Sequence, residues 1–388
     1  MNFEETHILN TLRRCTRCTL PETHETITFD VEGVCNICRN ADQKGDKVNW
    51  EARKKELHEL ADLHRGTGAY DCIVPFSGGK DSTYTLYYIV KELRLKPLVV
   101  SHDHGFYRPM TLANNERTLR KLGVDFIKMR GDWKVVRKLM LESLKRKGDF
   151  DWHAHVGLFT LPMRAAVHYK IPLLFWGEPS AEYTAYYNYD EIEEFDVTRH
   201  HKLNDLGIAA EDMAGFLGGE VNLRDLDFYR IPDEKDIHAL KMRSVCLGSY
   251  IPWDVREQSA LIADMLGWQG DQVEGVPPQY PYEKIEYQLQ GARDYLKFIK
   301  RGYARVTHLT SIDIRHGRMS RAEARKLIEE YEGKRPASLD YLLPILGITE
   351  EEWRTIATAQ RIPPYVHDFS QEKKAPPLPD MALWEQHP

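Results

Sequence analysis

The 388-residue sequence lacks a basic excess, and it lacks any apolar run long enough to span a membrane. It has 53 Lys and Arg against 59 Asp and Glu, a formal net charge of −6. Proteins that follow a nucleic-acid backbone usually carry a basic excess, so we expect no nucleic-acid partner and no membrane partner. The opening MNFEETHILN is acidic and polar rather than typical of a signal or transit peptide, which predicts a cytoplasmic protein.

Cysteine is also scarce, since the chain has six, and four of them lie near its start. Cys15, Cys18, Cys35 and Cys38 form C-x2-C-x16-C-x2-C, the spacing of a zinc ribbon, in which each pair binds one side of a tetrahedral ion. Four thiolates leave no open coordination position, so we expect a structural Zn²⁺ site. An iron–sulfur cluster and a redox dithiol are the alternatives.

By composition the chain divides into five parts. These are a four-cysteine metal-binding module (1–45), a linking helix (46–66), an α/β domain (67–270), a helical C-terminal region (271–374) and a tail (375–388). We expect the Pro-rich tail to be poorly ordered.

The third part alternates short apolar runs with helical patterns. It predicts strands near 70–76, 97–100, 124–129 and 171–176, and helices over 82–93, 111–122, 133–147 and 156–169. Strands that alternate with helices predict the α/β class, with a doubly wound parallel sheet that binds ligands at the carboxyl ends of its strands. Residues 280–335 are rich in helix formers and predict the helical C-terminal region.

The first apolar strand runs directly into the segment 77–82, which reads SGGKDS. Adjacent glycines let the backbone approach a phosphate closely, and the helix that follows offers free N–H groups and a favourable dipole. The segment is no Walker A loop, because its glycines are adjacent and an Asp follows the Lys. A plain glycine turn would explain the glycines but not the Ser, Lys, Asp and Ser around them.

SGGKDS after an apolar strand resembles the PP-loop of the ATP pyrophosphatases, which cleave ATP between its α and β phosphates. The resemblance implies an adenine nucleotide alpha hydrolase-like fold, with Asp81 near phosphate and Mg²⁺ and the second strand's exit, Ser101 to Gly105, near adenosine. The residues that it assigns to ATP are Phe76, Ser77, Gly78, Gly79, Lys80, Asp81, Ser82, Ser101, Asp103, His104 and Gly177.

Within that superfamily the chain is similar to the N-acetyl sugar amidotransferases of surface-glycan and nonulosonic-acid biosynthesis. The similarity lies in the four-cysteine head with Thr28–Cys38, the W-H-x-H-x-G stretch Trp152–Gly157, WGE at Trp176–Glu178 and the late segment Lys297–Ala324. It implies conversion of an acetamido group on a nucleotide-activated sugar into an acetamidino group, in LPS O-antigen or flagellar glycan biosynthesis. Some relatives carry a Cys between the two histidines, where this chain has Ala154.

The implied chemistry activates the amide by adenylation. The amide oxygen attacks the α-phosphorus of ATP, pyrophosphate departs, and ammonia displaces AMP from the O-adenylyl imidate. The loop N–H groups, Lys80 and Mg²⁺ would stabilise the departing pyrophosphate. Glu178 directly follows the predicted strand at 171–176, at the sheet edge where such folds bind ligands. We therefore expect catalytic roles for Lys80, Asp81 and Glu178.

Six further residues are candidate substrate contacts: His153, His155, Glu182, Tyr183, Arg305 and Arg315. The histidines suit substrate contact or proton transfer, although a polar pair that caps the next helix explains them equally well. Arginine suits bidentate phosphate contacts, but surface salt bridges explain either arginine taken alone.

The sequence offers no source of ammonia. Cys72 and Cys246 lie in no nucleophile motif, and the other cysteines are assigned to metal. We therefore expect free ammonium or a separate partner, for which the resemblance implies a glutaminase with a barrel-like synthase, similar to the pair of histidine biosynthesis. An alternative function is a PP-loop tRNA-modifying enzyme of the thiolase type, which the net charge and the single four-cysteine set disfavour. A zinc-ribbon module that binds without turnover is disfavoured by the complete loop.

Overall fold

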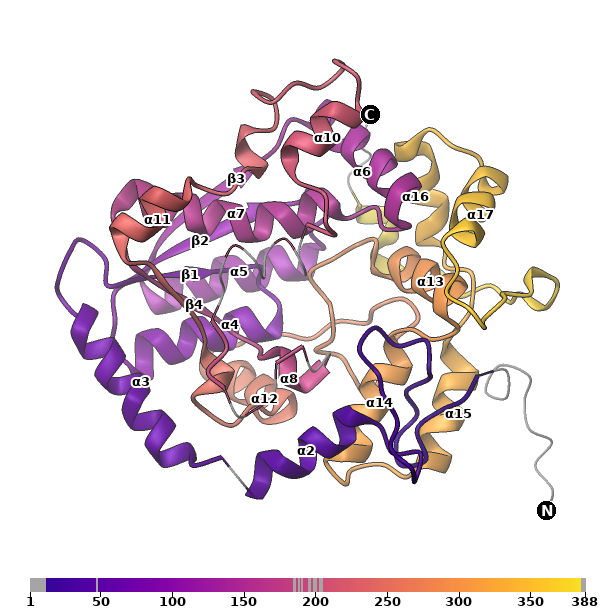
Figure 1. Cartoon of the computed structure of the whole chain (residues 1–388), viewed down its shortest axis with the longest axis horizontal. Coiled ribbons are helices and arrows are strands. Elements are labelled where there is room, and N and C mark those ends of the chain that lie inside the picture. Colours follow the sequence, from indigo (N-terminus) through magenta and orange to yellow (C-terminus); the bar gives the residue numbers. More distant parts are fainter. Residues whose placement is uncertain are drawn as a thin grey trace.

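A five-stranded parallel sheet forms the centre of the α/β domain (Figure 1). The structure, a computed structural model, describes residues 12–46, 48–183, 186–187, 189, 191–194, 197, 201 and 205–384. The strands are β1 (Cys72–Pro75), β2 (Pro97–Asp103), β3 (Asp125–Arg130), β4 (Leu173–Trp176) and β5 (Arg243–Cys246), in the order β3-β2-β1-β4-β5. The winding direction reverses between β1 and β4, and doubly wound folds bind ligands at this point.

The helices of the α/β domain follow the strands; the first four correspond to the helices that the sequence predicts, and the fifth was not predicted. They are α4 (Lys80–Tyr87), which continues into a π-helical turn over Tyr88–Glu92, α5 (Pro109–Leu122), α6 (Trp133–Lys147), α7 (Trp152–Tyr169) and α12 (Val255–Leu266). α5 begins with Pro109, whose fixed φ suits a first helical residue, and ends at Gly123 in the left-handed conformation. The sheet and these helices confirm the α/β class.

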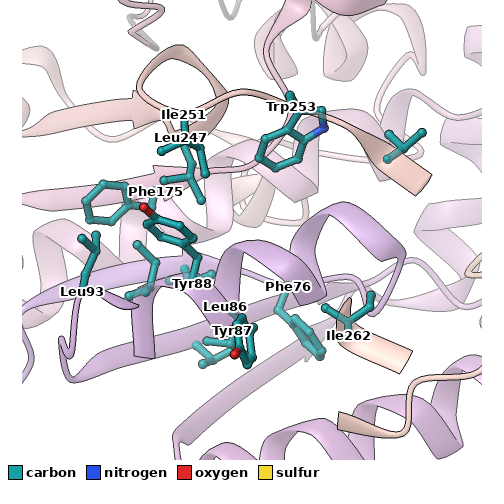
Figure 2. Close-up of a cluster of buried hydrophobic side chains, with 14 of the residues drawn as sticks. Phe76, Leu86, Tyr87, Tyr88, Leu93, Phe175, Leu247, Ile251, Trp253 and Ile262 are labelled. Carbon is teal, nitrogen blue, oxygen red and sulfur yellow. The ribbon is translucent and has the colours of Figure 1, made fainter. Parts of the chain in front are cut away.

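Different helices cover the two faces of the sheet. Successive residues of a strand point to opposite faces, so Cys72 and Val74 pack with α3 and α4, whereas Ile73 packs with Leu161 of α7. The first cluster contains Phe76, Leu86, Phe175, Trp253 and Ile262, and Figure 2 shows their side chains around α4 and the adjoining strands. This packing fixes the position of the loop between β1 and α4.

The four-cysteine module is joined to the α/β domain by α2 (Asn36–Asp46) and α3 (Trp50–His64). Asn49 caps α3, because its side chain accepts a hydrogen bond from the N–H of Ala52. The module packs against the C-terminal region, where Thr19 Oγ1 lies 2.8 Å from Ser311 Oγ and Arg321 donates to the carbonyl of Cys18. Figure 1 shows it beside α14 and α15.

The C-terminal region is helical, as expected. Its helices are α13 (Gln290–Arg301), α14 (Arg305–Arg315), α15 (Arg321–Tyr331), α16 (Ser338–Leu346) and α17 (Glu350–Ala359). α13, α16 and α17 share a buried cluster with α6, which includes Leu144, Ile299 and Trp353. The region therefore packs on the α/β domain as well as on the module.

The expectation of a poorly ordered tail is corrected for the described residues up to 384. Trp384 is 4% exposed and packs on Tyr341. Arg108 is buried and forms ion pairs with Asp271 at 2.8 Å and with Asp380 at 2.9 Å. A buried guanidinium requires paired carboxylates, and one of them comes from the tail.

Between β4 and α12, the described residues form short helices and β5. The helices are α8 (Ser180–Tyr183), α10 (Ala210–Phe216) and α11 (Glu234–Leu240). β5 was not expected, because Arg243–Cys246 is short and half polar, and it is identified by its pairing with β4. Within the described ranges, every helix is too short or too polar to cross a membrane.

We predict that Phe175→Ala destabilises the protein by about 3–5 kcal/mol, because Phe175 is 0% exposed and its removal leaves a cavity beside β4. Urea unfolding measures the change. As a control, Leu63→Ala removes a side chain that is 73% exposed, and its effect should stay within about 0.5 kcal/mol. Similar losses for both variants would contradict the packing described here.

Candidate functional site

The SGGKDS loop leaves the carboxyl end of β1 at the point where the sheet reverses direction. Gly78 has a φ of +84°, and the N–H groups of Ser77 and Gly78 donate to Ser82 Oγ at 3.2 and 3.1 Å. Gly79 is the N-cap residue of α4, and no side chain caps this helix. The first turn of α4 therefore presents N–H groups and its positive dipole to an anion at the loop.

Lys80 is buried and held by two carboxylates. Its Nζ lies 2.9 Å from Asp81 Oδ2 and 2.9 Å from Glu283 Oε2. The second oxygen of Glu283 accepts from Arg305 at 3.2 Å. Burial alone would raise the pKa of Glu283, but Lys80 and Arg305 outweigh it and lower the pKa to about 2. Sequence reasoning missed Glu283, which is 203 residues from Lys80.

Two carboxylate oxygens beside the loop are buried and have no hydrogen-bond partner among the described residues, namely Asp81 Oδ1 and Glu178 Oε1. Burial and the neighbouring Asp81 carboxylate raise the pKa of Glu178 well above its usual value. Two such oxygens fit a hard cation, which prefers oxygen ligands and would satisfy both.

A cavity of about 280 Å³ opens in front of the loop. Of the expected site residues, those that line it are Ser77, Gly79, Asp81, Ser82, His104, His155 and Gly177. The opposite wall comes from the C-terminal region, with Lys284, Glu286, Tyr287, Gln290 and Arg293. The sequence had placed no residue of 284–293 in the site, because nothing local indicates that this segment faces the loop.

Five residues assigned to ATP do not line this cavity, namely Phe76, Gly78, Lys80, Ser101 and Asp103. Phe76 lies in the core, and Ser101 Oγ contacts the hydroxyl of Tyr107 at 3.2 Å. Asp103 accepts hydrogen bonds from Lys128, Arg130 and the N–H of Gly105. Although burial raises the pKa of Asp103, these donors lower it to about 2. Its carboxylate therefore fixes the turn after β2.

The two histidines of the W-H-x-H stretch lie inside α7, which begins at Trp152 rather than at the expected 156. His153 is fully buried, its Nε2 lies 3.4 Å from the carbonyl of His104, and burial lowers its pKa to about 3. His155 Nε2 lies 2.8 Å from Arg293 Nη2 and lines the cavity. The two histidines thus have different environments, and neither precedes the helix as a cap.

A polar cluster that sequence reasoning missed surrounds Arg293. Arg293 Nε lies 3.1 Å from Asp151 Oδ2, and Asp151 also accepts from the hydroxyl of Tyr287. Burial raises the pKa of Asp151 to about 6. Ligand atoms of Asp149, Asp151 and His155 lie within 4.8 Å of one another, but the guanidinium of Arg293 already provides their positive charge. The sequence signal was the pair of aspartates just before the W-H-x-H stretch.

Glu182 and Arg315 lie away from the cavity lining. Glu182 accepts from Lys44 of α2 and from the hydroxyl of Tyr189, while Arg315 donates to the carbonyl of Glu182 at 3.0 Å. These contacts join α8 to the module and to α14. The side chain of Tyr183 lies outside the described residues, so its predicted role stays a prediction.

The four cysteines of the N-terminal module converge as predicted. All four sulfurs lie within 4.8 Å of one another, with Cys15 to Cys38 at 4.0 Å and Cys18 to Cys35 at 3.8 Å. The N–H groups of Cys18 and Cys35 point at Cys15 Sγ, at 3.4 and 3.2 Å. The cluster is therefore able to hold a metal ion.

We predict that Gly78→Ala abolishes anion binding at the loop. An added Cβ would lie 1.7 Å from Asn115 Oδ1, and the positive φ disfavours alanine by about 1–2 kcal/mol. Titration with inorganic pyrophosphate measures the loss. Gly66→Ala is the matched control, because Gly66 has a φ of +69° with nothing within 4 Å. Equal pyrophosphate affinity in wild type and Gly78→Ala would contradict the geometry.

Comparisons with other proteins found a similar curated protein and a solved structure. The chain is 29% identical over 135 residues to an uncharacterized protein of Methanocaldococcus jannaschii, a match that spans 34% of this chain and 47% of that protein. A search of solved structures aligns it with the U34-tRNA thiolase NcsA from Methanococcus maripaludis with its [4Fe-4S] cluster, at 13% identity and a TM-score of 0.29 over 82% of this chain and 89% of that one.

Residues 274–375 match the family described as LPS biosynthesis protein WbpG-like, C-terminal domain. This segment begins just before Glu283 and includes the cavity wall from Lys284 to Arg293. The match shows that residues 274–375 are similar to the C-terminal domain of WbpG-like LPS biosynthesis proteins, in agreement with the expected resemblance to surface-glycan biosynthesis proteins.

Proposed function

We propose that this protein is an ATP-dependent amidotransferase of LPS O-antigen or flagellar glycan biosynthesis. It converts an acetamido group of a nucleotide-activated sugar into an acetamidino group, and it releases AMP and pyrophosphate. The main support for the proposal is one observation. The WbpG-like segment and the SGGKDS loop form opposite walls of one cavity, and Glu283 forms an ion pair with Lys80. The part of the chain similar to LPS biosynthesis proteins and the phosphate-binding motif therefore share one site.

ATP is the substrate that the loop would bind. The N–H groups at the start of α4 and Nζ of Lys80 would contact the β and γ phosphates, which leave as pyrophosphate. Asp81 Oδ1 and Glu178 Oε1 would hold Mg²⁺, which supplies positive charge against the departing pyrophosphate. Burial and Asp81 raise the pKa of Glu178, and a cation bound beside it would lower that pKa and favour the ionised carboxylate.

The proposed reaction has two steps. The acetamido oxygen attacks the α-phosphorus, the bond to the β-phosphate oxygen breaks, and the amide nitrogen loses its proton as the O-adenylyl imidate forms. Ammonia then adds to the imidate carbon, and AMP leaves with the electron pair of the C–O bond. Asp151, on the cavity wall with a pKa raised to about 6 by burial, is suited to accept the proton that the added nitrogen loses.

Ammonia comes, in this proposal, from a separate glutaminase with a barrel-like synthase or from free ammonium. The described cysteines outside the four-cysteine module are both buried, Cys72 in β1 and Cys246 at the end of β5. Neither has the exposed position that a glutamine-cleaving thiolate requires.

We also propose that the four-cysteine module binds one structural Zn²⁺. In a tetrahedral site with Zn–S bonds of about 2.3 Å, the sulfurs lie about 3.8 Å apart. The separations of 3.8 and 4.0 Å fit this geometry. In a four-iron cluster each cysteine binds a different iron, which spreads the sulfurs farther than the arrangement here.

The amidotransferase proposal predicts a product that mass spectrometry can identify. We expect one UDP- or CMP-linked diacetamido sugar, incubated with the protein, ATP, Mg²⁺ and ammonium, to exchange one oxygen for NH as AMP and pyrophosphate form. Asp81→Asn should reduce the rate at least about 100-fold. Asp62→Asn, which changes an exposed carboxylate on α3, should leave the rate unchanged.

A different outcome would favour another function. Release of AMP triggered by tRNA, with every sugar unchanged, would identify a tRNA-modifying enzyme of the thiolase type and overturn the amidotransferase proposal.

The zinc proposal predicts one zinc ion per chain by elemental analysis. Cys35→Ser should lose most of this zinc and loosen the module, which limited proteolysis near residues 12–46 would detect. Cys72→Ala serves as the control, because Cys72 lies in β1, and this variant should keep its zinc. Iron with inorganic sulfide in place of zinc would show that the module holds a cluster.

A further inference from the structure

The cavity wall opposite the loop is formed by the first turn of α13. Gln290 and Arg293 are three residues apart on this helix, so their side chains lie on the same face, and both line the cavity. Arg293 is held by its neighbours: its Nε lies 3.1 Å from Asp151, and its Nη2 lies 2.8 Å from His155 Nε2. Arg293 therefore holds this wall in place.

Gln290 differs from Arg293. The residue is 1% exposed, and its Nε2 has no hydrogen-bond partner in the part of the chain that the structure describes. A buried amide donor without a partner destabilises the folded chain, and native proteins keep few of them. Because Gln290 lines the cavity, a bound molecule that accepts this hydrogen bond would remove the penalty.

The rest of the cavity fits a flat, partly polar ring system. Tyr107, Trp176 and Leu158 supply apolar and aromatic lining, and His102 Nε2 is a second buried atom without a hydrogen-bond partner among the described residues. A volume of about 280 Å³ is at the small end for ligand pockets, so it holds a nucleoside rather than two nucleotides. The loop that forms the opposite wall would place that nucleoside's phosphates at α4.

We propose that Gln290 reads the adenine base of ATP, so that the C-terminal region sets the nucleotide specificity of the loop. A carboxamide presents a donor beside an acceptor, which matches the ring nitrogen and the exocyclic amino group of adenine. Guanine presents two acceptors along the same edge and would leave the amide oxygen of Gln290 unpaired. This inference rests on the proposed function, because that function brings ATP to the cavity.

Calorimetric titration of the full chain tests the inference without turnover. The probes are α,β-methylene-ATP, the corresponding GTP analogue and inorganic tripolyphosphate. We expect Gln290→Leu to reduce the affinity for the ATP analogue at least about tenfold and to abolish the preference for it over the GTP analogue. The affinity for tripolyphosphate should change by less than about twofold. Gln288→Leu is the matched control, since Gln288 is also a buried glutamine with one orphaned amide atom but does not line the cavity.

The outcomes separate this inference from the proposed function. Two outcomes would overturn the role of Gln290 and leave the proposed function standing. In the first, Gln290→Leu binds the ATP analogue with unchanged affinity; in the second, it loses affinity for the ATP analogue and for tripolyphosphate equally. If the wild-type protein binds neither analogue, the proposed function is overturned as well. Should Gln290→Leu fail to fold, Gln290→Glu decides, because glutamate keeps the shape of the side chain and lacks the donor; retained affinity for the ATP analogue would then overturn the inference.

Discussion

The buried ion pair between Lys80 and Glu283 is the interaction on which the site depends. Lys80 is 4% exposed and the Glu283 side chain 1%, and charges so deeply buried are stable only when they are paired. Since Lys80 lies in the loop after β1 and Glu283 lies in the C-terminal region, neither half of the molecule forms the site alone. Arg305 extends the pair to the start of α14 and makes the position of that helix depend on the loop.

Much of the α/β domain could be predicted from the sequence, because its information is local. The apolar runs at β1 to β4 and the amphipathic helices between them have a periodicity that burial imposes on short segments. The loop was predictable for the same reason, since its residues are consecutive. β5 was missed, because four residues with an arginine and a serine have no clear pattern and become a strand by pairing with β4.

The second wall of the site was not predictable in this way. Gln290 and Arg293 face the loop because of how α13 packs on α6, α16 and α17, which is a long-range property. Glu283 lies in the segment just before α13 and reaches Lys80 across the same contact. The prediction for the tail was wrong for a similar reason. The composition after 375 indicates disorder, whereas Asp380 pairs with the buried Arg108 just before α5. The boundary expected between 270 and 271 stays a prediction, although side chains from both sides of it form one cavity.

The separation of 203 residues between Lys80 and Glu283 has a consequence for synthesis of the chain. At about 5–20 residues per second, the ribosome completes the loop roughly 10–40 s before it adds the glutamate. During that interval Lys80 lacks one of its two carboxylate partners, and the cavity lacks the wall that the C-terminal region supplies. A nascent chain therefore completes the buried ion pair and the cavity only after the C-terminal region has emerged from the ribosome.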